Sequence, residues 1–133
     1  MKALLVFLAA AAFGSLSGAA AVAAESAEPA VMRVVIIQTA DLKTYTHELS
    51  VEEAMLRKVG VNCTFKVWQA HYAGPDTGAI VVALQFANWD MFTRYLNAGR
   101  LHPDLGAQMA KFNPSLRKVV SDSVYLEVPP GGG

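Results

Sequence analysis

Three histidines are the side chains of this 133-residue chain that titrate most readily near neutral pH, and they lie on separate segments. They are His47, His71 and His102. His47 and Glu48 begin the zinc-protease pattern H-E-x-x-H, but Val51 stands where the second histidine would be. No pair of histidines has the spacing of metal ligands, so we predict neither a metal site nor a cofactor.

His71 belongs to an alternating run that suggests a ligand site. Gln69 and His71 should share one strand face with apolar residues, and Gln38 should end a buried row of the first strand. Polar groups that interrupt an apolar sheet face need partners and often line a pocket. We therefore predict a ligand-binding cleft between sheet and helices, lined by Gln38, Gln69 and His71 and closed by Phe92 and Tyr95. The alternative is that His71, near a hairpin tip, simply extends into water.

Four strands and two helical regions should position these side chains. Apolar alternation predicts strands over residues 31–39, 63–73, 78–86 and 116–128. Asp41 and Asn88 suit helix N-caps, which predicts helices near 41–59 and 88–112, the first with a possible break at Ser50 and the second with a stop at Gly99. The order β-α-β-β-α-β is that of the α+β ferredoxin-like fold, a four-stranded antiparallel sheet with helices on one face.

The turn formers at residues 74–77 predict an antiparallel hairpin between the two middle strands. A four-residue loop would place Gln69 opposite Val82 and Phe65 opposite Phe86. Both faces of this hairpin are apolar enough that we expect both to be buried, and helices on one face would leave the other exposed to solvent. We therefore predict a homodimer through the face that holds Trp68, Tyr72, Val81 and Ala83.

The first 24 residues have the order of a secretory signal peptide: one cation at Lys2, an apolar run, and small residues up to a cleavage site near Ala24. An uncleaved anchor is the alternative. Residues 25–30 read as a linker, 31–129 as one domain and 130–133 as a flexible tail. We expect a periplasmic or secreted protein with no membrane association after cleavage.

Charge and cysteine content exclude several partners. Without Lys2, ten basic residues stand against eleven acidic ones, which argues against nucleic acid and anionic membrane surfaces as partners. Cys63 is the single cysteine, so an intramolecular disulfide is impossible. We expect Cys63 to be a buried, inert thiol, with a bridge between two chains as the alternative.

Two segments, "VWQAHYAGPDTGAIVVALQFANWDMF" and "VVSDSVYLEVP", together with the order of elements, resemble the dimeric α/β-barrel superfamily. The likeness covers about residues 31–129 and is to small exported bacterial members near the antibiotic-biosynthesis-monooxygenase and NIPSNAP-type groups. It implies two sheets packed face to face in a homodimer.

Function is less sharply indicated than fold. We expect an exported dimer that binds a small apolar or aromatic ligand without catalysis, and whether it is an enzyme stays open. The alternative implied by the resemblance is a cofactor-free monooxygenase acting on a small aromatic or polyketide-like compound. A third possibility is haem or metal binding. Haem-degrading members use an asparagine, a tryptophan and a histidine where this chain has Gln38, Tyr95 and Leu105.

Overall fold

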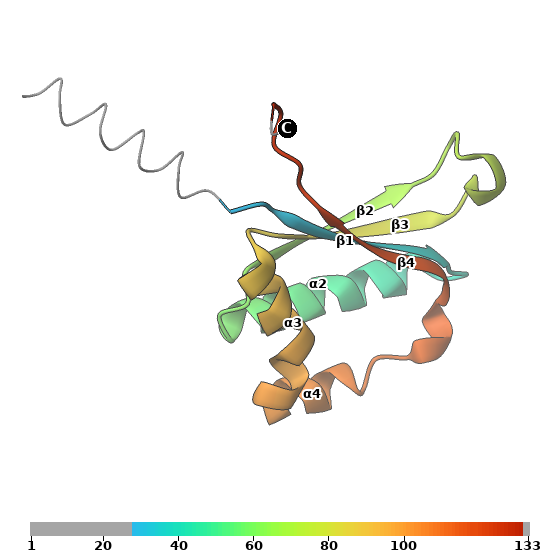
Figure 1. The fold of residues 1–133 in the computed structure, drawn as a ribbon. Helices are drawn as coiled ribbons and strands as arrows, with labels where there is room; N and C mark the ends of the chain where they lie inside the picture. Colours follow the sequence, from blue (N-terminus) through green and yellow to red (C-terminus); the bar gives the residue numbers. More distant parts are fainter. Residues whose placement is uncertain (1–27, 132–133) are drawn as a thin grey trace, which may run out of the picture.

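The computed structural model describes residues 28–131, and the predicted signal peptide, residues 1–24, lies outside them (Figure 1). Two single 3-10 turns, Gly74–Asp76 and Pro114–Leu116, connect longer elements. The helices and strands, in chain order, are β1 (Val31–Gln38), α2 (Leu42–Lys58), β2 (Cys63–Gln69), β3 (Ile80–Phe86), α3 (Trp89–Leu101), α4 (Pro103–Met109) and β4 (Lys118–Leu126). Within residues 28–131, no helix has the length and hydropathy needed to cross a bilayer.

The four strands form one sheet in the order β2-β3-β1-β4, and every neighbouring pair is antiparallel. This confirms the predicted α+β architecture with a four-stranded antiparallel sheet and helices. The observed strands are up to four residues shorter at an end than predicted, and the connections before β3 and β4 contain the 3-10 turns Gly74–Asp76 and Pro114–Leu116.

The helices cover one face of the sheet, and no described residue forms a layer over the other (Figure 1). Leu49 and Leu56 of α2, Phe92 of α3 and Leu105 of α4 are buried with apolar side chains of the strands. On β1 the row that faces the helices is Val31, Arg33, Val35 and Ile37. The prediction that Gln38 ends a buried row was therefore wrong, because all residues of β1 but one are apolar up to Ile37 and both of its faces look alike in sequence.

The two long helices begin where the sequence predicts. Asp41 accepts a hydrogen bond from the Thr44 N–H at 3.0 Å, and Asn88 accepts one from the Met91 N–H at 2.9 Å. The expected break at Ser50 is absent, since α2 continues through it and the Ser50 hydroxyl donates to the His47 carbonyl at 2.7 Å.

Gly99 does not end α3, contrary to the sequence prediction, because its role is in helix packing. The helix continues to Leu101, and α4 then turns back so that Gly106 lies against Gly99. A Cβ atom added to Gly106 would be 2.6 Å from the Gly99 carbonyl oxygen. The two glycines thus let the backbones of α3 and α4 approach more closely than side chains would allow.

The β2–β3 hairpin is shifted by two residues from its predicted register. Gln69 pairs with Ile80 and Phe65 with Leu84. The connection is longer than four residues: it contains the 3-10 turn, and the Ala70 N–H donates to the Ala79 carbonyl at 2.9 Å. Because the shift is even, each side chain stays on its predicted face. His71 and Tyr72, predicted to lie in the strand, lie in the loop instead.

A β-bulge interrupts the pairing of β4 with β1. Ile36 pairs with Ser121 and Ile37 with Val119, which leaves Val120 as an extra residue. Residues on a regular strand alternate between faces. The extra residue therefore places both Val119 and Asp122, which are three apart, on the face that the helices cover.

Candidate functional site

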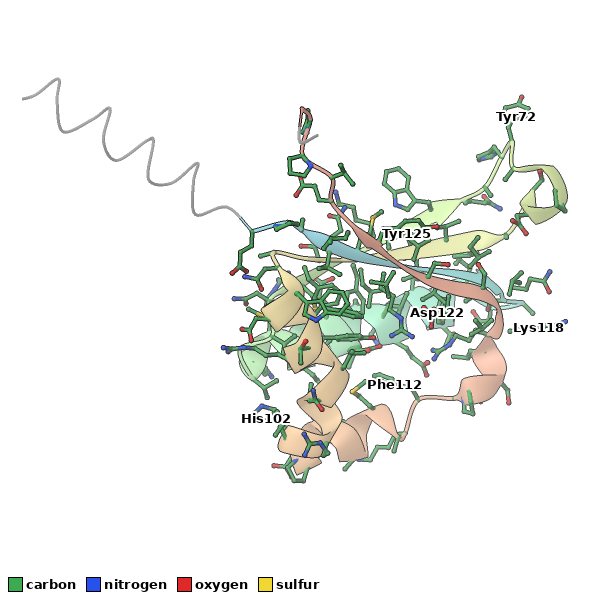
Figure 2. All side chains as sticks on the ribbon, viewed as in Figure 1. Tyr72, His102, Phe112, Lys118, Asp122 and Tyr125 are labelled. Carbon is green, nitrogen blue, oxygen red and sulfur yellow. The ribbon has the colours of Figure 1, made fainter. Side chains whose placement is uncertain are left out.

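A charged cluster lies at the centre of the helix-covered face, built around Arg33 of β1. Its guanidinium forms a bidentate pair with Asp122 of β4, with Nε–Oδ1 at 2.9 Å and Nη2–Oδ2 at 2.5 Å. Its Nη1 also donates to the Tyr95 hydroxyl of α3 at 2.9 Å. Figure 2 shows Asp122 on the helix side of the sheet and Tyr125 on the opposite side. One arginine thus connects two strands and a helix.

The pKa values of these groups follow from their contacts. The hydrogen bond to Asp122 raises the pKa of Arg33 above its ordinary value, and the same bond lowers the pKa of Asp122 below its ordinary value. Burial raises the pKa of Tyr95 to about 12. At neutral pH the cluster therefore contains a charged pair and a neutral phenol, whose own proton remains available for donation to a ligand.

A cavity of about 100 Å³ lies beside this cluster, between the sheet and α2. We call it the sheet–helix cavity. Aromatic and aliphatic side chains form most of its wall, with four charged side chains among them. Its lining comprises Arg33, Val35, Tyr45, Leu49, Glu52, Phe65, Val82, Leu84, Tyr95, Arg117, Val119 and Asp122.

Glu52 and Arg117 are the charged residues of the cavity that stand outside the Arg33 pair. Glu52, on α2, is half-buried, and no described residue donates a hydrogen bond to its carboxylate. Burial raises the pKa of Glu52, while the charges of Arg117 and Arg33 lower it less strongly. The guanidinium carbon of Arg117 lies 5.9 Å from the centre of the Tyr45 ring. The cavity thus holds a carboxylate, Glu52, and a guanidinium, Arg117, that do not form an ion pair with each other.

The structure separates the five side chains that the sequence grouped into one cleft. Tyr95 lines the sheet–helix cavity, whereas Phe92 is buried in the core with its ring 5.3 Å from that of Phe86. Gln38 and Gln69 line a different depression, about 470 Å³, at the end of the sheet beneath the β2–β3 loop. His71 is exposed in that loop and lines neither hollow.

Sequence reasoning missed the four charged residues of the cavity, although two of them left a signal. Arg33 interrupts an otherwise apolar strand, and Asp122 interrupts the alternating apolar residues of β4. Glu52 is one of several carboxylates on the long helix and had no such signal. Arg117 reaches the cavity only because of the bulge at Val120, which no sequence pattern indicated.

The remaining candidate residues are spread over the fold. Within residues 28–131, no three histidine, cysteine or carboxylate side chains gather closely enough to hold a metal ion. Cys63 is buried as a free thiol, and burial raises its pKa to about 11, so the unreactive protonated form prevails at neutral pH.

The sheet face opposite the helices is largely apolar, although Lys66, Gln85, Ser121 and Ser123 also lie on it, and it contains most of the predicted dimer residues. Trp68 and Val81 pair across the hairpin there, next to Ala83. Tyr72 projects from the hairpin loop, well beyond the sheet (Figure 2). We call this surface the open face, and it comprises Met32, Val34, Ile36, Trp68, Val81, Ala83 and Tyr125.

Comparison with known proteins adds no family to this description. No protein-family model matches the chain, and no curated protein or solved structure matches it either. Its function must therefore be argued from the site itself.

Proposed function

We propose that this protein is exported and acts as a homodimer of ferredoxin-like protomers, a dimeric α/β barrel, that binds a small aromatic or apolar ligand without catalysing a reaction on it. One observation carries the proposal: the sheet–helix cavity combines an aromatic wall with fixed hydrogen-bond donors. The rings of Tyr45, Phe65 and Tyr95 suit an apolar ligand, while the Tyr95 hydroxyl suits one polar substituent on it.

The volume of the cavity limits the ligand. An apolar cavity of about 150 Å³ admits benzene, and pockets for drug-sized molecules measure roughly 300–1,000 Å³. A cavity of about 100 Å³ is smaller than both, so a ligand of one small ring fits only with part of it in the opening of the cavity to solvent. The volume argues against haem and against a polyketide-like substrate of the monooxygenase alternative, both larger than one ring, but it does not separate binding of a small aromatic compound from catalysis on one.

The strand arrangement supports a ferredoxin-like protomer. β1 and β2 are parallel to each other with β3 between them, and β3 and β4 are parallel with β1 between them. Each βαβ unit is therefore split by a strand of the other, and all helices lie on one face.

The open face supports the homodimer. Trp68 is 59% exposed and Tyr125 is 53% exposed, and both are surrounded by partly exposed aliphatic side chains of β1 and β3. A contiguous apolar surface of this kind usually marks an interface. A second copy would cover it with the same surface, as a two-fold interface requires.

Ligand binding can be tested by filling the mouth of the cavity. Benzyl alcohol, a neutral one-ring probe, should bind the wild-type protein in ligand-detected NMR and calorimetry. Val119→Trp places a bulky ring in the cavity and should abolish this binding, whereas Val120→Trp is a matched control because Val120 is similarly exposed and does not line the cavity. Equal binding by the two variants, or none by the wild type, would refute the proposal.

A further inference from the structure

The charges of the sheet–helix cavity balance only when Glu52 is ionised. Arg33 and Arg117 supply two positive charges, and Asp122 and Glu52 supply two negative ones. Asp122 is committed to Arg33 by two hydrogen bonds. Among the described residues, Arg117 has no carboxylate within ion-pair distance, and neither arginine is that close to Glu52. One cation and one anion therefore share the cavity without neutralising each other directly.

We propose that the natural ligand is a small aromatic carboxylate, held by Arg117, and that Glu52 takes up one proton when this anion binds. This inference rests on the ligand-binding function proposed above and names the chemical class of its ligand. The proton comes from solvent, and one O–H bond forms on the Glu52 carboxylate. The ligand stays ionised, since a carboxylic acid has lost its proton well below neutral pH.

Electrostatic repulsion couples binding of the carboxylate ligand to protonation of Glu52. A second anion beside ionised Glu52 would leave one unbalanced negative charge in a half-buried site, whereas protonation of Glu52 restores the balance. Glu52 is suited to this because it is half-buried and no described residue donates a hydrogen bond that would hold its ionised form. Burial already raises its pKa, and a nearby anion raises it further. The titratable or charged groups around it are Arg33, Tyr45, Glu48, Cys63, Tyr95, Arg117 and Asp122.

The ring and the carboxylate of such a ligand would use different parts of the lining. The aromatic wall takes the ring, as it would for a neutral ligand. Arg117 lies over the Tyr45 ring rather than against a carboxylate, so its guanidinium donors can turn to a ligand without breaking an ion pair. Arg33 is less available, because its donors already serve Asp122 and Tyr95.

Calorimetry with benzoate tests the inference on the whole protein. Titrations between pH 5 and 9, in buffers of different ionisation enthalpy, measure the protons taken up on binding. We expect uptake to approach one proton, with affinity falling up to about tenfold per pH unit where uptake is complete. Glu52→Gln should bind benzoate with no uptake and a flat pH profile. Arg117→Gln should no longer bind benzoate but should still bind benzyl alcohol.

Each outcome decides between the two proposals. Benzoate binding to the wild type without proton uptake, or the same uptake in Glu52→Gln, would overturn this inference alone. Binding of benzyl alcohol but not of benzoate would also overturn it alone, and failure of both probes would overturn the proposed function with it. Infrared difference spectra of the wild type need no variant: a protonated carboxyl band must appear when benzoate is added, and its absence would reject the proton step.

Discussion

Arg33 places a permanent charge on the inner face of a central strand, so its partners decide whether that strand can pack. A charge in this position is tolerated when hydrogen bonds satisfy it, and here Asp122 and Tyr95 do so. Removing one partner leaves the arginine partly desolvated and unpaired. Changes to the partners should therefore cost more than changes to ion pairs on the surface.

Asp122→Asn should destabilise the fold by about 1–2 kcal/mol at neutral pH, discounted for the partial exposure of the pair. Asp90→Asn is the matched control, because it weakens the exposed i,i+4 pair with Arg94 and should cost about 0.5 kcal/mol or less. Urea denaturation of the two variants and the wild type measures both values. Equal losses would show that the Arg33 pair is no more than a surface contact.

The effect of Asp122 should depend on pH in one direction. The hydrogen bond from Arg33 lowers the folded-state pKa of Asp122 below its ordinary value of 3.8. The stabilisation is therefore fully present above pH 3.8 and is lost as the pH falls through the lowered pKa. The stability difference between wild type and Asp122→Asn should stay constant from pH 5 to 8 and shrink in more acidic solution.

Tyr95 should reveal itself in alkaline solution. Burial raises its pKa to about 12 from an ordinary value of 10.0, so the stability linked to its protonated form is complete below pH 10 and lost as the pH rises toward 12. Burial also raises the pKa of Tyr45, so ultraviolet titration of the four tyrosines should show a late-ionising component that loses the Tyr95 share in Tyr95→Phe. Tyr125→Phe, at an exposed tyrosine, should leave that component in place.

At the residue scale, the sequence indicated neither the charged residues of the cavity nor which of the predicted site residues lie together. A clear cap and apolar spacing placed Tyr95 on its helix, but it lines a cavity other than the cleft predicted with Gln38, Gln69 and His71. Gln38 was assigned to the wrong row, since a strand that is apolar on both faces gives no parity signal. His71 was predicted to lie in a strand over residues 63–73 but lies in the loop, because the loop length could not be read from its turn residues.

Among the elements, the α3–α4 corner depends on how closely two backbones approach. Gly106→Ala should destabilise the fold by about 1–3 kcal/mol, because its Cβ would clash with the Gly99 carbonyl oxygen, a backbone atom. Gly99→Ala meets only an ordinary contact of 3.5 Å and should be neutral or stabilising by up to about 1 kcal/mol. Chemical denaturation of this pair of variants is the measurement, and equal stabilities would mean that α4 moves freely.

The elements themselves were largely predictable. Caps at Asp41 and Asn88 gave the helix starts, and apolar alternation gave four strands in the right places. The hairpin register and the bulge at Val120 were not predictable. Both depend on how many residues stay unpaired, in the loop or in the bulge, and only the pairing of the folded strands sets that number.

For the whole molecule, the proposed dimer predicts that a glutamate in place of one tryptophan changes the assembly and that the same change at the other does not. Trp68→Glu should dissociate the dimer, because it places a charge within the open face, where a second copy would bury it. Trp89→Glu is the matched control: Trp89 is 57% exposed on α3, on the helix side of the sheet, and its substitution should leave the assembly unchanged. Sedimentation at micromolar concentration distinguishes them, and a monomeric wild type would contradict the homodimer.

Because of the bulge at Val120, the cavity depends on the number of residues between Arg117 and Asp122 as well as on which residues they are. Arg117 and Asp122 are five apart, a spacing that a regular strand would divide between its two faces, and the extra residue lets both line one cavity. A one-residue deletion there would keep both side chains in the sequence and yet turn Arg117 away. In an alignment, a gap at this position would therefore mark the loss of the site even where all its charged residues are identical.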